Sequence, residues 1–328
     1  MGELPKERLQ PCPPWYNVSV DLFGPFWVCD TVKRRVKKKV FGVIFSCMVT
    51  RSVHLDISEG YDTRNFLTVL KKFTCLRGFP KKLYSDNGTQ LVSANKEMRE
   101  MVIQWNKKEI FNFGKFKGLS WVFNKSADAP WENACSESLI RLVKRSLTRI
   151  IGDSVVSFGE LQAVMYEVAN VLNERPIGFK PGENLDEGTV LRPNDLLLGR
   201  STIEAPCGFW EESINTNRTH AFKIKIVDLF WKKWMKNYFP TLIVRQKWHV
   251  SKRNVQKGDI VLVNDQNVLR GEWKLAQVVD ATHGRDGKTR DVILRYKRND
   301  SGNYVGQRDM LLTRSVHRLV VILPVEEQ

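Results

Sequence analysis

The most constraining feature of the chain is a nearly continuous apolar run, VFGVIFSCMVT, at residues 40–50. A run of this length, apolar at both alternating positions, is typical of a central strand that is covered on both faces. Alternating, β-branched segments lie on either side of it, NVSVDLF at 17–23 and SVHLDI at 52–57, and are expected to form strands next to it. We expect Gly24-Pro25 to end the first of these strands. The sequence thus predicts the centre of a sheet that is packed on both faces.

Helical periodicity follows these three strands. Residues 63–77 place apolar side chains at helical spacing, and Gly78 and Pro80 end the segment. The remaining elements expected in this region are a strand at 81–85, a helix at 92–108, a strand at 119–124, and helices at 132–151 and 157–173. This order predicts the α/β class: a mixed sheet with helices packed on its faces.

The length of 328 residues predicts two or three domains. From residue 257 onward the pattern changes to short β segments, and Asp286-Gly287 predicts a hairpin between two of them. In the helix expected at 220–240, aromatic side chains alternate with lysines, and we favour their packing on the first domain over contact with DNA or a partner. The predicted organisation is an extended arm at 1–14, a core at 15–180, a linker with amphipathic helices at 181–254, and a small β-barrel domain at 255–328.

The net charge of +16 suggests a polyanionic partner, with nucleic acid as the first candidate and a membrane surface as the second. The excess is uneven: residues 1–150 have a balance of +12, residues 151–200 of −4, and residues 201–328 of +8. The run KRRVKKK at 33–39 is typical of a solvated hairpin loop and is compatible with contact to DNA or with a nuclear import signal. No apolar run is long enough to cross a membrane, and the N-terminus lacks the apolar region of a secretory signal.

The six cysteines are scattered, and no CxxC pair occurs. This argues against a zinc ribbon or a disulfide scaffold and fits a reducing compartment. His54 lies inside a predicted strand and is expected to be a satisfied core residue rather than a ligand.

Three acidic residues occupy positions where carboxylates suggest function. Asp21 lies inside the first apolar strand, Asp86 follows the strand at 81–85, and Glu137 lies early in a basic helix. A carboxylate in a strand is costly to bury unless it is paired or binds a cation. Converging carboxylates bind Mg²⁺ or Mn²⁺, and two such ions can clamp the attacking and leaving oxygens of a phosphoryl displacement. Composition alone still leaves open that these are ordinary salt-bridged acids.

Six segments, in order, resemble the integrases of retroelements. The resemblance lies in VDLFGPF (20–26) with MVTRSVHLDI (48–57), SDNGTQ (85–90), PWENACSESLIRLVKRSL (130–147), RPNDLLLG (192–199) and RGEWKLAQVVD (270–280). It is closest to the BEL/Pao group of LTR retrotransposons and covers nearly the whole chain. It implies an RNase H-like mixed sheet flanked by helices, followed by a small all-β SH3-like barrel.

The resemblance also implies the D,D-E catalytic triad at Asp21, Asp86 and Glu137, which would bind Mg²⁺ or Mn²⁺. Glu132 is the rival for the third position. Glu137 is preferred because basic residues follow it four and seven positions later, as they do in the family.

These basic residues and the loop after Asp86 are the expected contacts to nucleic acid. Arg141, Lys144 and Arg145 share one helical face with Glu137, whereas Leu139, Val143, Leu147 and Ile150 share another that would pack on the sheet. A solvated face without a partner is an equal alternative for Arg141, Lys144 and Arg145. Asn87 is expected to stabilise the loop after Asp86 by a local hydrogen bond.

The implied reaction is metal-dependent polynucleotidyl transfer: cleavage near the 3′ end of the element's DNA, then attack of the new 3′-OH on target DNA. The implied partners are element ends, target DNA and further copies of the chain, with no membrane, and the implied location is the nucleus after synthesis in the cytoplasm. The family's upstream His₂Cys₂ zinc domain is missing here, so no structural zinc is expected. This leaves two alternatives open: a non-catalytic DNA-binding remnant or host-adopted protein, and a ribonuclease H-type nuclease.

Overall fold

The computed structural model describes residues 6–29, 36–60, 63–85, 119–123, 130–151, 155–180, 189–199, 218–242, 253–265, 273–284, 287–296, 299–300, 303–304 and 310–327. These residues belong to two compact units. Unit one comprises Met1–Asn173 and Asn215–Phe230, and unit two comprises Glu174–Ile214 and Trp231–Gln328. The predicted domain boundaries stay predictions, since the two units divide at other residues.

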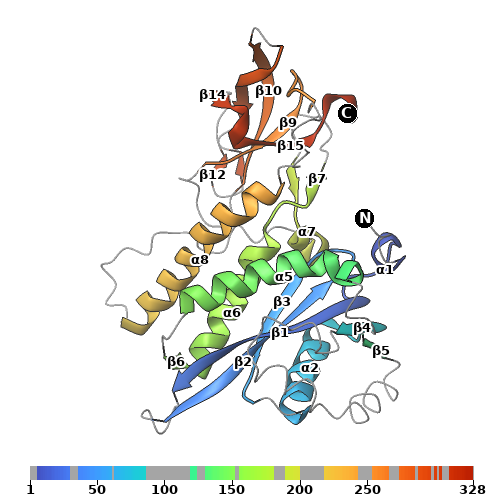
Figure 1. Ribbon diagram of the computed structural model, residues 1–328, viewed down its shortest axis with the longest axis vertical. Helices are drawn as coiled ribbons and strands as arrows, with labels where there is room; N and C mark the ends of the chain where they lie inside the picture. The colour runs from blue at the N-terminus through green and yellow to red at the C-terminus, as the bar shows by residue number, and fades with distance from the viewer. Residues whose placement is uncertain are drawn as a thin grey trace. The chain divides into compact units, whose positions relative to one another are not determined.

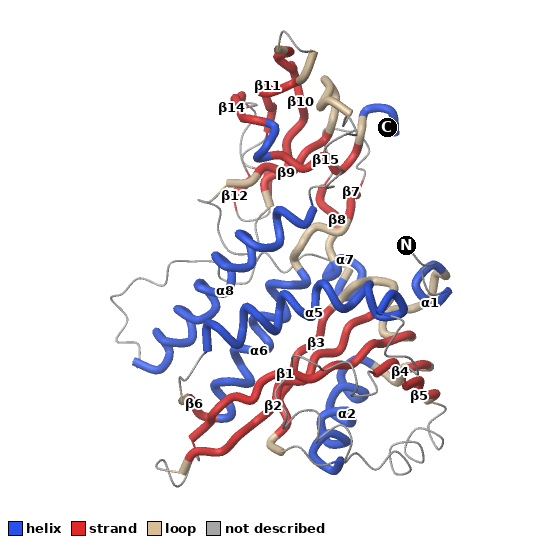
Figure 2. Tube along the Cα trace, in the orientation of Figure 1, coloured by secondary structure: helices blue, strands red, loops and turns tan. Residues whose placement is uncertain are grey.

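Unit one is built around a six-stranded mixed sheet (Figures 1 and 2). Its strands are β1 (Asn17–Cys29), β2 (Lys37–Cys47), β3 (Val53–Ser58), β4 (Lys82–Ser85), β5 (Ser120–Phe123) and β6 (Val156–Ser157). The order is β3-β2-β1-β4-β5, and β6 pairs with the end of β1. The first three strands are antiparallel, whereas β4, β5 and β6 join in parallel. The predicted α/β class with a mixed sheet is therefore confirmed.

Helices cover both faces of this sheet. They are α2 (Thr63–Arg77), α5 (Pro130–Ile151) and α6 (Phe158–Asn173). The apolar side chains predicted at helical spacing in α2, Phe66, Val69, Leu70 and Phe73, are buried. Phe73 stacks on Phe45 of β2 with ring centroids 4.2 Å apart. Phe45 pairs across the sheet with Val20, which points away from Asp21 because side chains alternate along a strand. Asp21 therefore lies on the face opposite to α2. The helix predicted at 92–108 lies outside the described residues.

The outer edge of β3 is closed by α6. Asn173 accepts a hydrogen bond from the Val53 backbone amide at 2.7 Å and donates one to the Val53 carbonyl at 2.8 Å. Both residues are buried. The helix thus supplies the pairing that a neighbouring strand would give and protects the edge of the sheet.

The prediction that the first strand ends at Gly24-Pro25 is wrong, because β1 continues to Cys29. The pairing with β2 shifts by one residue between Phe23 and Phe26, and Gly24 in that bulge has a φ of +114°. Glycine adopts this conformation without a steric penalty, and the bulge lets the ladder resume beyond the proline. The strand is long enough to form a ribbon with β2 that passes the end of β3.

The N-terminal arm was predicted to be extended. Part of it is helical instead, because α1 (Lys6–Leu9) forms one helical turn. The prolines of this segment leave KERL uninterrupted. Glu7 in this turn pairs with Lys82 of β4 at 2.7 Å, which fixes the turn on unit one.

Unit two begins with a two-stranded sheet of β7 (Gly178–Lys180) and β8 (Thr189–Leu191), followed by α7 (Pro193–Leu198). The following helix, α8 (Arg218–Leu242), contributes its first residues to unit one and its remainder to unit two. Its aromatic residues were expected to pack on the first domain. Phe230 is buried and belongs to unit one, whereas Trp231 and Tyr238 make edge-to-face contacts with Trp273 of unit two at 5.7 and 6.0 Å.

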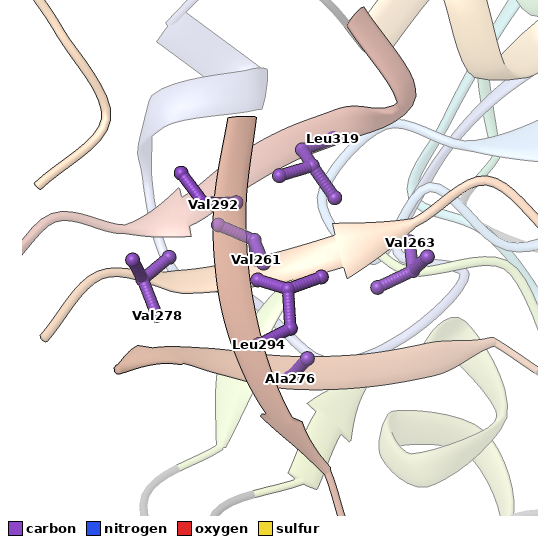
Figure 3. Close-up of a cluster of buried hydrophobic side chains, with 7 residues drawn as sticks. All are labelled: Val261, Val263, Ala276, Val278, Val292, Leu294 and Leu319. Carbon is purple, nitrogen blue, oxygen red and sulfur yellow. The ribbon is translucent and has the colours of Figure 1, made fainter. Parts of the chain in front are cut away.

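The C-terminal part of unit two is a five-stranded antiparallel sheet in the order β14-β11-β10-β9-β15. Its strands are β9 (Ile260–Val263), β10 (Lys274–His283), β11 (Thr289–Tyr296), β14 (Met310–Ser315) and β15 (Leu319–Leu323). A separate short pair is formed by β12 (Asn299–Asp300) and β13 (Asn303–Tyr304), and short 3₁₀ turns lie at Val316–Arg318 and Val325–Glu327. Figure 3 shows the strand that carries Val292 and Leu294 crossing the strand that carries Val261 and Val263, with the side chains between them. The buried side chains in Figure 3 fill the space between these strands, and closure into the predicted small barrel stays a prediction.

Candidate active site

Asp21 lies in the middle of β1, a central strand of the sheet in unit one. Its direct neighbours Val20 and Leu22 are buried, whereas the Asp21 side chain keeps 26% of its surface exposed. Its cross-strand partner on β2 is Ile44. The carboxylate therefore stands on the face opposite to α2, partly open to solvent, in an otherwise apolar strand.

Both oxygens of Asp21 accept hydrogen bonds. Oδ1 accepts one from the Leu22 backbone amide at 2.7 Å, and Oδ2 accepts one from the Lys144 ammonium at 2.5 Å. The Lys144 side chain is only 22% exposed. A half-buried ion pair with hydrogen-bonding geometry holds the ammonium directly on the carboxylate.

This ion pair joins α5 to β1. The buried face of α5 includes Ile140, Val143, Leu147 and Ile151. The sequence correctly predicts Val143 and Leu147 on this face, but the residue fully buried near the helix end is Ile151, and Ile150 is only partly buried. Packing of this face against the sheet brings the neighbouring face, with Lys144, to Asp21.

The second predicted carboxylate follows the strand next to Asp21. β4 pairs with β1 in parallel, and its last residue Ser85 is aligned with Val20, the residue before Asp21. Asp86 and Asn87 themselves lie outside the described residues. The structure thus describes the strand that leads to Asp86, and the position of the Asp86 carboxylate stays a prediction.

The third predicted carboxylate belongs to α5. Glu137 and its rival Glu132 lie within the helix, and their side chains are outside the described part of the structure. Glu137 precedes Lys144 by seven residues, about two helical turns, and so lies on the same face of α5. Convergence of Asp21, Asp86 and Glu137 stays a prediction.

The three predicted basic contacts on α5 differ in their surroundings. Arg141 and Arg145 are exposed, whereas Lys144 is half-buried against Asp21. The ion pair between Lys144 and Asp21 was not predicted from the sequence. The pattern that could have indicated it is an apolar strand with one acid, together with an amphipathic helix that has a lysine beside its apolar face.

A divalent metal ion fits the one carboxylate of the predicted triad that the structure describes. Asp21 is partly exposed, and the Lys144 ammonium on Oδ2 stands in for a cation there. Carboxylate oxygens are the ligands that Mg²⁺ and Mn²⁺ prefer. Within the described ranges, no three His, Cys, Asp or Glu side chains gather into a metal-binding group.

A second polar cluster of unit one was only partly predicted. His54 is a buried core residue, as expected, but its Nε2 has no hydrogen-bond partner among the described atoms. Two residues further on, Asp56 is fully buried and its Oδ1 accepts hydrogen bonds from Gln162 at 2.7 Å and Tyr166 at 3.4 Å. Burial and the neighbouring Arg77 lower the pKa of His54 to about 4, although Asp56 opposes this.

Comparison with known proteins gives one family match and two structural likenesses. Residues 218–322 match a family described as a family of unknown function (DUF5641), which spans α8 and most of the C-terminal sheet but not Asp21. No curated protein matches the chain.

Among solved structures, the chain is similar to a chain of the simian T-cell lymphotropic virus intasome in complex with PP2A regulatory subunit B56 gamma. The likeness has 9% identity and a TM-score of 0.36 and covers 99% of this chain and 85% of that one. The chain is also similar to the HTLV-2 integrase catalytic core domain in complex with magnesium (trimeric form), with 12% identity and a TM-score of 0.31 over 51% of this chain and 92% of that one. At these TM-scores the fold assignment rests on the strand order and pairing of the chain itself. None of the helices in the described ranges is both long and apolar enough to span a membrane.

Proposed function

We propose that the chain is an integrase-like polynucleotidyl transferase that acts on DNA, of the BEL/Pao retrotransposon type. The observation that carries the proposal is the partly exposed Asp21 carboxylate, paired with Lys144 on a central strand, next to the parallel strand that leads into Asp86. The strand order β3-β2-β1-β4-β5, antiparallel over three strands and then parallel, supports an RNase H-like core. The five-stranded antiparallel C-terminal sheet supports an SH3-like barrel that helps to hold DNA.

In this proposal Asp21, Asp86 and Glu137 hold Mg²⁺ or Mn²⁺. When bound, such ions supply activation of the attacking oxygen and stabilisation of the charge that develops on the phosphate. Asp21 contributes a carboxylate that the Leu22 amide orients through Oδ1, which leaves Oδ2 to face the cation.

The exposed face of α5 would bind the DNA backbone. Arg141 and Arg145 project from the helix into solvent, and Lys144 would move from Asp21 to a phosphate when a metal ion takes its place. Phosphate contacts of this kind make affinity fall steeply with salt. Assembly of several copies on DNA and a nuclear location are part of the same proposal.

One observation favours a second candidate function. Lys144 already neutralises Asp21, so the fold needs no metal ion to tolerate this carboxylate. A DNA-binding protein that keeps the fold without the chemistry is consistent with that arrangement.

The deciding experiment gives the purified chain short duplex DNA ends with Mn²⁺ or Mg²⁺ and measures nicking and strand joining. Asp21→Asn, Asp86→Asn and Glu137→Gln should each abolish product while DNA binding persists. Glu132→Gln is the matched control and should retain activity; if it alone among the glutamate variants is inactive, the third ligand is Glu132. A wild-type chain that binds DNA and yields no product supports the non-catalytic function instead.

A further inference from the structure

The ribbon of β1 and β2 has a strongly basic end. Trp27 pairs across the ribbon with Lys39, and the next two pairs bring Lys38 and Lys37 opposite Val28 and Cys29. In Figure 1 the ribbon runs to the lower left, whereas β4 and β5 lie at the other end of β1. We call Trp27 and Lys37–Lys39 the ribbon end.

Trp27 presents part of its indole to solvent. It is 37% exposed, while its strand neighbours Phe26 and Val28 are only 1% and 3% exposed. The Lys39 ammonium lies 5.4 Å from the centre of the Trp27 ring, a distance at which cation and ring attract each other. The ribbon end therefore combines an aromatic face with a fixed positive charge.

Three consecutive exposed lysines continue this charge along the edge of the sheet. β3 pairs with β2 from Phe41 onward, so among the described strands only β1 pairs with Lys37–Lys39. Lysines on an edge strand can serve merely to prevent pairing with other chains. That role does not require a partly exposed tryptophan beside the lysines. A ligand that contacts both the indole ring and the lysines would use both groups.

A similar ring and lysine elsewhere in unit one provide a comparison. Tyr16 is also 37% exposed, and Lys81 lies 5.5 Å from its ring centre. There, however, the adjacent Lys82 is neutralised by Glu7 at 2.7 Å. The ribbon end differs because it carries three lysines in a row, of which Lys37 and Lys39 lie on the same face as Trp27 and Lys38 on the opposite face.

We propose that the ribbon end binds single-stranded DNA, with an unpaired base stacked on Trp27 and backbone phosphates bound by Lys37 and Lys39 on the same face. Aromatic rings that stack on bases, beside cations that follow the backbone, are how proteins bind single strands without sequence preference. Stacking on the ring face requires an unpaired base, which selects a single strand over a closed duplex.

The choice of DNA as the partner rests on the proposed function. The binding by the ribbon end does not depend on the proposed reaction. Trp27 lies six residues along β1 from Asp21, which corresponds to about 20 Å at about 3.3 Å per residue. The ribbon end therefore contacts nucleotides several positions away from any phosphate that reacts at Asp21. It would hold a displaced or frayed strand beside the reacting site.

The test measures the binding of the full-length chain to a fluorescein-labelled 20-nucleotide oligothymidine and to a duplex of the same length. Fluorescence anisotropy is recorded over a range of NaCl concentrations, with EDTA present so that no chemistry occurs. The variants are Trp27→Ala, Trp27→Phe, and the combined Lys37→Gln, Lys38→Gln and Lys39→Gln. The matched controls are Tyr16→Ala and the combined Arg64→Gln, Lys71→Gln and Lys81→Gln, which remove the same charge from exposed sites on unit one.

Trp27→Ala should weaken binding of the single strand about 10-fold and leave duplex binding unchanged, while Trp27→Phe retains most of the affinity. The triple lysine variant should lower the slope of log K against log salt by about 1.4 for the single strand, because the phosphate contacts of Lys37 and Lys39 are lost. Ribbon-end variants that behave like their controls, or a Trp27 effect that is equal on duplex, overturn this inference while the proposed function stands. A wild-type chain that binds neither DNA overturns both.

Discussion

The Lys144 ammonium of α5 lies 2.5 Å from Oδ2 of Asp21, so a cation supplied by the chain itself sits on the carboxylate at the centre of the proposed site. The two residues are 123 positions apart in the sequence. A metal ion that binds Asp21 must compete with this ammonium.

Replacing Lys144 should therefore strengthen metal binding. Lys144→Gln removes the competing charge, and we expect Mn²⁺ to bind about 3- to 10-fold more tightly in isothermal titration calorimetry without DNA. Arg145→Gln is the control, since it removes an exposed charge from the next residue. An equal change in both variants would show a general charge effect, and no Mn²⁺ binding by any form would contradict the proposed metal site.

The close packing of Phe23 over Gly42 predicts a second outcome. A Cβ atom at position 42 would lie 2.3 Å from Cζ of Phe23, whose ring is almost completely buried. Gly42→Ala should therefore lower the free energy of unfolding by about 1–3 kcal/mol in urea denaturation. Gly159→Ala in α6, where the added Cβ would meet nothing within 4 Å, should leave stability unchanged or slightly raised. Equal stability of both variants would mean that Phe23 can move aside at no cost.

The buried His54 should make unit one sensitive to mild acid. Burial among Phe45, Phe73 and Tyr166, together with Arg77, lowers the His54 pKa to about 4, and Asp56 opposes this shift. Below the unfolded pKa of about 6.5 the unfolded chain binds the proton and the folded chain does not, so stability falls with pH between about 6.5 and 4.

We expect the wild type to lose up to about 2 kcal/mol of unfolding free energy between pH 7.5 and 5 from this residue. His54→Phe should reduce that loss, as measured by urea denaturation at the two pH values. His317→Gln, at an exposed position of unit two, serves as the control. The same loss in wild type and His54→Phe would show that His54 is not the responsible group.

Asp259 anchors the end of the chain to the C-terminal sheet. It is fully buried and accepts hydrogen bonds from the Arg253 guanidinium at 2.7 and 2.8 Å, and from the backbone amides of Gln256 and Val325, both at 2.9 Å. Burial alone would raise the Asp259 pKa, but these hydrogen bonds outweigh it and hold the pKa below its usual value.

Arg253→Met should destabilise unit two by about 3 kcal/mol, because it leaves the Asp259 charge buried without its partner. Hydrogen exchange of the β9 and β15 amides would report this loss, with Lys257→Met at a nearby exposed position as the control. Since the Asp259 pKa is lowered, its contribution in the wild type is present above pH about 4 and lost as the pH falls through the folded value. Unchanged exchange in Arg253→Met would show that the two backbone amides suffice.

Most elements of unit one could be predicted because their signals are local. The helix at Thr63–Arg77 and the strand from Asn17 follow from periodicity over a few turns or residues. The strand end at Gly24-Pro25 was mispredicted because a bulge, which depends on the pairing of β1 with β2, carries the strand past the proline. At the candidate site, Asp21 was placed correctly inside the strand that begins at Asn17.

The sequence by itself determined the class of the sheet and the acid inside the strand that begins at Asn17, since each is a matter of side-chain order along one segment. Lys37–Lys39, which were predicted to lie in a hairpin loop, belong to strand β2 instead. Only the tertiary structure decided which cation meets Asp21, that Asn173 closes the edge at Val53, and that Trp231 packs against Trp273. These contacts join segments that are far apart in the chain. Their formation depends on how whole elements pack, and local sequence patterns do not encode that packing residue by residue.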